Sequence, residues 1–185
     1  MPVHDYDPPE RFVAGTVGEP GSRTFFLQAR RGTRMTTVAL EKAQVAALAE
    51  RVAELLDEVV RRSGGQAPVP ALATTGSEDT APLETPIEEE FRVGTMSLAW
   101  DGERDVVVIE CFEVDEDGDG PEEEVLGSPD PSRAVLRVSL DGVGARAFTT
   151  RALALVAAGR PPCPFCTNPL DATGHICPRA NGYRR

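Results

Sequence analysis

Residues 36–62 read TTVALEKAQVAALAERVAELLDEVVRR, and the spacing of their apolar side chains changes partway along. At the start, Val38 and Leu40 point to one side at a period of two, which is typical of a strand with one buried face. Further on, apolar side chains recur every three or four positions, at Val45, Leu48, Val52, Leu55, Leu56 and Val59. This stretch therefore predicts a strand followed by an amphipathic helix that ends near Arg62.

Two earlier runs, RFVAGTVG at residues 11–18 and RTFFLQARR at residues 23–31, also read as strands. Between them, Pro20-Gly21 suits a type II turn, because proline fixes its own φ and glycine accepts the positive φ that follows. With the strand at residue 36 they predict an antiparallel sheet.

The second half of the chain repeats this order. Its strands are predicted from FRVGTMSLAW (91–100), DVVVIECFEV (105–114) and AVLRVSL (134–140). Asp101-Gly102 is a hairpin signal between the first two. Residues 141–159 then place apolar side chains at helical spacing.

We therefore predict an α+β fold made of tandem βββα units, each an antiparallel sheet covered by one helix. The expected units are residues 1–62 and 91–160, with a flexible linker or long loop at 63–90 and a short C-terminal tail at 161–185. A few identities recur at an offset of one hundred, among them Val38 with Val138, Leu40 with Leu140 and Arg51 with Arg151. They favour an internal repeat, although two unrelated βββα units would also look alike.

The tail reads RPPCPFCTNPLDATGHICPRANGYRR, residues 160–185, and contains three of the four cysteines. Two ligands in a CxxC turn and two in a second short turn are the arrangement of a tetrahedral zinc site. The sequence therefore predicts one structural Zn2+ bound by Cys163, Cys166, His175 and Cys177. Since the tail has little apolar material, we expect it to fold only with its metal.

Three alternatives exist for this cluster. The pair Cys163 and Cys166 is similar to the CPFC pair of glutaredoxins, but such a pair precedes a helix in a βαβ unit, whereas this one follows a helix. An iron–sulfur cluster also accepts cysteine and histidine ligands, and the thiols could bind nothing. Catalytic zinc is disfavoured because four protein ligands leave no open position.

Other candidate sites are weaker. Asp115, Asp117, Asp119 and Gly120 begin like a calcium loop, but the twelfth position is Leu126 where such a loop needs a glutamate. Cys111 lies in an apolar run and is expected in the core. His4 and His175 are the only histidines. We therefore predict no catalytic and no further cofactor-binding residues, and we favour a protein that is not an enzyme.

The net charge is -11, and residues 1–63 balance nine Lys and Arg against nine Asp and Glu. The acidic excess thus lies after residue 63, which argues against binding to duplex nucleic acid. No run approaches the length of a membrane span. The first residues lack the basic and apolar regions of a signal peptide. These features predict a cytoplasmic protein without membrane partners.

Three strings resemble an actinobacterial family of unknown function: RFVAGTVGEPGSRTFFLQAR (11–30), VALEKAQVAALAERV (38–52), and GRPPCPFC with GHICPRANGYRR (159–166 and 174–185). The resemblance covers almost the whole chain and implies a bacterial cytoplasm, but no activity. One departure is Thr167, where such zinc turns usually carry glycine.

Sheet-then-helix units in tandem also resemble the Pur-alpha and Whirly proteins, which bind single-stranded nucleic acid. Here the corresponding face would use aromatic and basic side chains, namely Phe25, Phe26, Arg30, Arg31 and Arg34. The sequence thus favours a non-catalytic adaptor or regulator that binds a protein partner. The alternatives are single-strand binding through the first-half sheet and a small enzyme of unknown class.

Overall fold

The computed structural model of the chain describes residues 2–19, 21–73, 79–114, 133–158, 163–166, 177 and 179. Its elements are seven strands and two helices: β1 (Val3–Tyr6), β2 (Arg11–Val17), β3 (Thr24–Arg31), β4 (Arg34–Leu40), α1 (Lys42–Arg62), β5 (Glu89–Asp101), β6 (Val106–Glu113), β7 (Val135–Asp141) and α2 (Gly142–Ala157). The predicted α+β class is confirmed, and α1 ends at Arg62 as the periodicity indicated.

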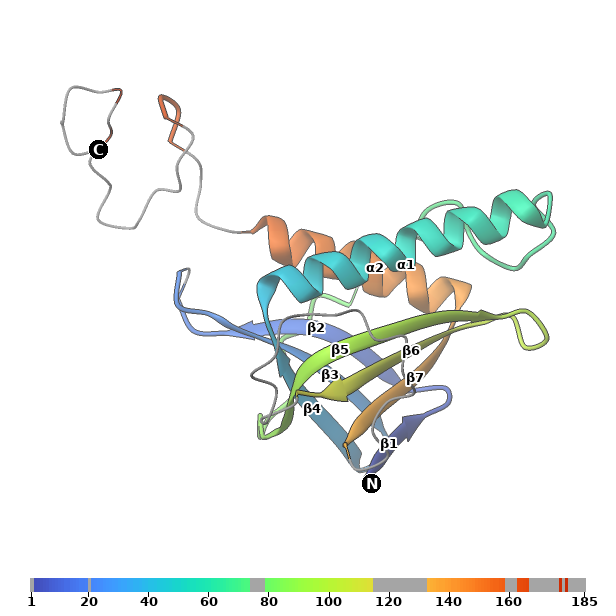
Figure 1. Cartoon of the computed structure of the whole chain (residues 1–185), viewed down its shortest axis with the longest axis horizontal. Helices are drawn as coiled ribbons and strands as arrows, with labels where there is room; N and C mark the ends of the chain where they lie inside the picture. Colours follow the sequence, from blue (N-terminus) through green and yellow to red (C-terminus); the bar gives the residue numbers. More distant parts are fainter. Residues whose placement is uncertain are drawn as a thin grey trace.

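All seven strands form one sheet in the order β1-β7-β6-β5-β4-β3-β2. Within each half the three strands are antiparallel, whereas β4 pairs with β5 in parallel and β1 pairs with β7 in parallel. The sheet is strongly curved, and both helices lie side by side across one of its two faces (Figure 1). The main core lies between the helices and this face of the sheet.

The tandem βββα organisation is not confirmed by this arrangement. Strand β1 belongs to the first half of the sequence but pairs with β7 of the second half. The two halves also share one continuous sheet through the β4–β5 pair. The repeat and the four domain boundaries therefore stay predictions.

Alternation along β2 and β3 sorts side chains onto the two faces of the sheet. Phe12, Ala14 and Leu27 face the helices, and Phe12 stacks on Phe148 of α2 with ring centroids 4.8 Å apart. Helix α1 buries five side chains against the same core: Val45, Leu48, Ala49, Val52 and Leu56. The period change in residues 36–62 therefore marks the point where the chain leaves the sheet to cover it.

The start of α1 is fixed to the second half of the sheet. Glu41 and Gln44 form a reciprocal capping box, which satisfies backbone donors that a helix start leaves unpaired. The side-chain amide of Gln44 also donates to the carbonyls of Val93 and Gly94 in β5, at 3.1 and 2.9 Å. One residue thus caps the helix and ties it to β5.

Residues 79–88, which we name the strap, begin beside α2 and continue on the face of the sheet opposite the helices. Leu83 is 8% exposed and packs in a second cluster with Val13, Phe26 and Ala39, while Ile87 packs at its side. Until Glu89 the strap contains neither helix nor strand. The sheet is therefore covered on both faces at β2–β4.

Among the described residues, neither helix combines the length and the apolar character that a membrane crossing requires.

Cys111 is completely buried in β6, as the apolar run predicted. Burial, with a smaller contribution from Glu110, raises the pKa of its thiol to about 12. Because the thiolate is the reactive form, only about one molecule in 10⁴ would carry it at pH 8. We expect Cys111 to resist alkylation by iodoacetamide in the native protein and to react after denaturation, as read by peptide mass spectrometry. Rapid native labelling would contradict this burial.

Candidate functional site

Three cysteines of the tail come together although ten residues lie between the second and the third. Cys163 and Cys166 lie at the ends of a short turn, and Cys177 approaches them from further along the chain. Their sulfur atoms all lie within 4.8 Å of one another. Cys163 and Cys177 are buried, while Cys166 is partly exposed. Three of the four predicted zinc ligands therefore converge on one point.

The sulfur spacing fits a shared metal ion. Two thiolates bound to one tetrahedral zinc at about 2.3 Å lie roughly 3.8 Å from each other. The Cys163 and Cys177 Sγ atoms are 3.8 Å apart, well beyond the S–S bond of about 2.05 Å in a disulfide. None of the described cysteines forms a disulfide. The spacing is thus that of co-ligands rather than of a cross-link.

The surroundings of Cys163 favour the ligand form of its sulfur. Burial raises the pKa of this thiol. Hydrogen bonds from the backbone N–H groups of Cys166 and Phe165, together with contacts with the other two cysteines, lower the pKa by more than burial raises it, so the net pKa is below the ordinary value. Backbone donors of a CxxC turn act in this way because they stabilise the thiolate. In addition, the Arg179 guanidinium donates to the Phe165 carbonyl at 3.3 Å, so the chain after Cys177 contacts the turn.

Several predicted site residues lie outside the described residues. His175, the fourth predicted ligand, is one of them. The acidic run with Asp115, Asp117 and Asp119 is another. Neither prediction is tested by the structure. His4 is described, and its Nδ1 lies 3.1 Å from Thr36 Oγ1.

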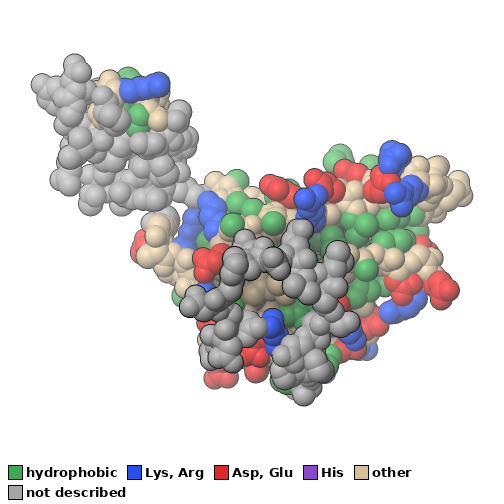
Figure 2. Space-filling view, viewed as in Figure 1, with side chains coloured by type: hydrophobic (Ala, Val, Ile, Leu, Met, Phe, Trp, Pro, Cys, Tyr) green, Lys and Arg blue, Asp and Glu red, His purple; other side chains and the backbone are tan. Residues whose placement is uncertain are grey.

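The aromatic and basic residues expected on a single-strand binding face are not gathered on one open surface. Phe25 faces the helices, while Phe26 lies beneath the strap at 8% exposure. Arg30 lies between two carboxylates, at 2.7 and 3.0 Å. Arg31 and Arg34 donate to main-chain carbonyls in and just after β1. On the face drawn in Figure 2, acidic and basic side chains are interspersed over the described surface.

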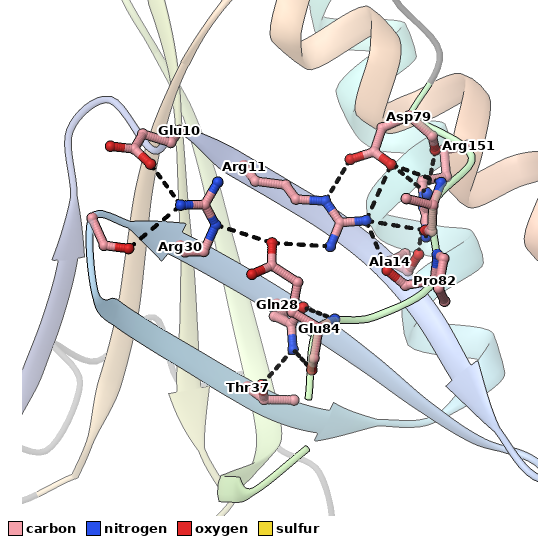
Figure 3. A network of polar contacts seen from close by, with 12 residues as sticks. Glu10, Arg11, Ala14, Gln28, Arg30, Thr37, Asp79, Pro82, Glu84 and Arg151 are labelled. Atoms are coloured by element: carbon pink, nitrogen blue, oxygen red, sulfur yellow. Dashed lines mark hydrogen bonds and ion pairs between the residues drawn. The ribbon is translucent and has the colours of Figure 1, made fainter. Parts of the chain in front are cut away.

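Sequence reasoning missed a second constellation, in which two arginines hold the strap (Figure 3). Arg11 of β2 binds the Asp79 carboxylate with two donors, Nε at 2.5 Å and Nη2 at 3.1 Å. Arg151 of α2 approaches the same carboxylate at 3.2 Å. The side chains of Arg11 and Arg151 are only 11% and 15% exposed. We name this pair the arginine clamp.

The arginine clamp also binds the main chain of the strap. Arg11 Nη2 donates to the carbonyls of Ala81 and Pro82 at 3.0 and 2.9 Å, and Arg151 Nη2 donates to Ala81 at 2.8 Å. Arg151 Nε donates to the carbonyl of Ala14 in edge strand β2 at 2.8 Å. The strap therefore passes around the β2 edge of the sheet, from α2 to the opposite face.

Beyond the clamp, a buried side-chain amide forms hydrogen bonds with the strap backbone. Gln28 accepts from the N–H of Glu84 at 2.8 Å and donates to the carbonyl of the same residue at 3.0 Å. Gln28 and its neighbour Thr37 are each 2% exposed. The Glu84 carboxylate lies 3.0 Å from Nε of Arg30. No spacing rule in the sequence connects these residues, because they come from distant parts of the chain.

The pKa of Asp79 is lowered, chiefly by its hydrogen bonds with Arg11, so Asp79 stabilises the fold only when ionised. This stabilisation is present above the unfolded pKa of about 3.9 and is lost as pH falls through the folded value. We expect Asp79→Asn to lower the free energy of unfolding by about 1 kcal/mol at pH 7, a figure kept small because the carboxylate is a third exposed. The difference from wild type should shrink as pH falls below the unfolded pKa and through the lower folded pKa of Asp79. Urea unfolding across pH measures it, and a constant difference would contradict this linkage.

A family model described as protein of unknown function (DUF3090) matches residues 4–177 of the chain. No curated protein and no solved structure matches it.

Proposed function

The chain belongs to this family of proteins of unknown function, and we propose that it is a zinc-stapled, non-catalytic adaptor or regulator that binds another protein. The observation that carries the zinc site is the convergence of Cys163, Cys166 and Cys177, with two of their sulfurs at the spacing of co-ligands. His175 completes the proposed ligand set, which needs a fourth donor for tetrahedral geometry.

The same geometry favours one ion over the alternatives. In a [4Fe–4S] cluster each cysteine binds a different iron, and in a [2Fe–2S] cluster only two cysteines share one iron, so three sulfurs within 4.8 Å of one another favour a single ion. In a redox pair, two cysteines exchange a disulfide and the third has no reason to converge. Thiolate and imidazole ligands together suit zinc by their softness. With all four positions filled, the zinc would supply folding energy to the tail rather than catalysis.

The adaptor role rests on the composition of the chain. The chain has only two histidines, one of them assigned to zinc, so a Ser-His-Asp set would have to use His4. The acidic excess after residue 63 suits a partner with a basic surface. We place the protein in a bacterial cytoplasm, in line with the resemblance to the actinobacterial family. We also propose that the two halves of the chain arose by duplication of a βββα unit.

Single-strand binding is the second candidate, but the strap covers the Phe26 face and carboxylates already pair Arg30. Nucleic acid would therefore have to displace the strap before it reached this face. Titration with oligonucleotides at low salt, where phosphate contacts are strongest, tests this alternative.

The first experiment is metal analysis of the purified native protein, with zinc and iron quantified together per chain. We expect about one zinc per chain and negligible iron. Iron in place of zinc, or no metal with reactive thiols at Cys163 and Cys166, would contradict the zinc staple. The adaptor role is tested separately by affinity capture from the native host, and it fails if no partner is recovered reproducibly.

A further inference from the structure

We propose that the arginine clamp and the adjoining face of β2–β4 form a docking groove for an extended acidic peptide segment of a partner protein, and that the strap occupies this groove in cis. This inference rests on the proposed protein-binding role and adds a second, arginine-lined surface to the acidic one that the composition indicates. The groove is defined by Arg11, Arg151, Gln28, Arg30 and Gly15.

The groove recognises mainly the backbone of its occupant. Arg11 and Arg151 donate to the carbonyls of Ala81 and Pro82. Gln28 bonds both the N–H and the carbonyl of Glu84. Main-chain contacts of this kind serve any extended segment, as they do when a peptide adds to a sheet. The occupant is therefore not restricted to this chain's own residues.

Three side-chain positions of the strap have the most specific contacts, and they define the chemistry of the partner. The Asp79 carboxylate is held by both arginines of the clamp, and the Glu84 carboxylate by Arg30. Bidentate pairs between arginine and carboxylate give geometric specificity as well as attraction. Leu83 lies directly over Gly15, where a Cβ atom would come within 2.5 Å of Leu83 Cδ2. A matching peptide carries an acidic residue, an apolar residue four positions later and a second acidic residue after it.

Two hollows beside Asp79 offer contacts that the strap leaves unused. One, of about 170 Å³, is lined by Phe12, Leu140 and Phe148 together with the clamp. The other, of about 320 Å³, is lined by Thr80 of the strap and by Ala154 and Leu155 of α2. Apolar hollows next to a few convergent polar groups are the usual form of binding sites. A partner could fill them with flanking side chains.

The strap is suited to being displaced. Its only deeply buried side chain is Leu83, and Asp79 is 34% exposed. The sheet beneath it carries the polar side chains Gln28 and Thr37 beside the apolar Phe26, so the face that the strap leaves offers both polar and apolar contacts to a peptide. A tethered segment acts at an effective concentration in the millimolar range. A partner therefore competes when its additional contacts give a dissociation constant well below that range.

The test uses the full-length, metal-loaded protein and a fluorescent peptide with the chain's own sequence DTAPLETPI, residues 79–87. The doubly substituted variant Asp79→Asn/Leu83→Ala weakens the strap without changing the groove. We expect this variant to bind the peptide at least about tenfold more tightly than wild type, because its competitor in cis is weaker. Adding Arg11→Gln should abolish the gain. Arg51→Gln removes an exposed ion pair with Glu54 on α1 and serves as the matched control.

A second measurement needs no variant. Hydrogen exchange of wild type should show the Glu84 amide opening well before the amides of β3, because the strap opens without global unfolding. The proposal would be overturned if the amides of the strap exchanged only when the amides of the sheet exchange. It would also be overturned by a double variant that is folded and metal-loaded but binds no peptide. If peptide binding required dimerisation, the assignment of the groove to a partner protein would be wrong, and the groove would bind a second copy of this chain. The metal analysis and the affinity capture test the proposed function independently of these results.

Discussion

Replacing Cys163 by serine is expected to abolish metal binding at the proposed zinc site and to unfold the tail, while the seven-stranded sheet stays intact. Cys163 is buried, and its sulfur lies 3.8 Å from that of Cys177. Serine supplies a poor ligand in place of a thiolate, so we expect the metal content to fall from about one ion to below about 0.1 per chain. Because metal binding is the main source of folding energy for such segments, the tail should become the first site of tryptic cleavage.

Cys111→Ala is the matched control for this substitution. It also removes one buried thiol, but this thiol lies in β6 and takes no part in the cysteine cluster. It should retain the metal and lose about 1 kcal/mol of stability through the small cavity that it leaves. Full metal content in the Cys163→Ser protein, or tail cleavage that is insensitive to a chelator, would refute the staple.

Local patterns in the sequence predicted those parts of the molecule that neighbouring residues determine. The period change in residues 36–62 placed β4 and α1 because burial on one face requires that spacing. The CPFC turn and Cys177 indicated a metal site because metal ligands occur at characteristic spacings. In the first case the pattern repeats over neighbouring turns of the chain. In the second case the residues are recognised by their distinctive side-chain chemistry.

Long-range pairings could not be predicted in the same way. Strand β1 consists of only VHDY, a segment whose polar residues and proline-rich surroundings show no strand period, yet it pairs with β7. The strap has the composition of a loop, and its placement depends on Arg11 and Arg151, which lie far from it in the sequence. Arginine is common on exposed surfaces, so nothing in the sequence distinguishes these two from the others.

Gly15 provides a test of whether the strap is packed on the sheet as described. A Cβ atom at this position would lie within 2.5 Å of Leu83 Cδ2 and 2.9 Å of Leu83 Cδ1. We therefore expect Gly15→Ala to destabilise the protein by about 1–3 kcal/mol, the usual cost of overpacking. The measurement is chemical unfolding, with hydrogen exchange to show whether the strap loosens first.

The same substitution should have the opposite sign when Leu83 is absent. In a strand, alanine is intrinsically favoured over glycine by roughly 0.5–1 kcal/mol, because glycine loses more conformational freedom on folding. In the Leu83→Ala background, Gly15→Ala should therefore be neutral or stabilising, and a double-mutant cycle would then give a coupling energy of about 1 kcal/mol or more. Additive effects of the two substitutions would mean that Leu83 does not rest on Gly15. In that case the strap would not cover this face, and the docking groove would lose its occupant in cis.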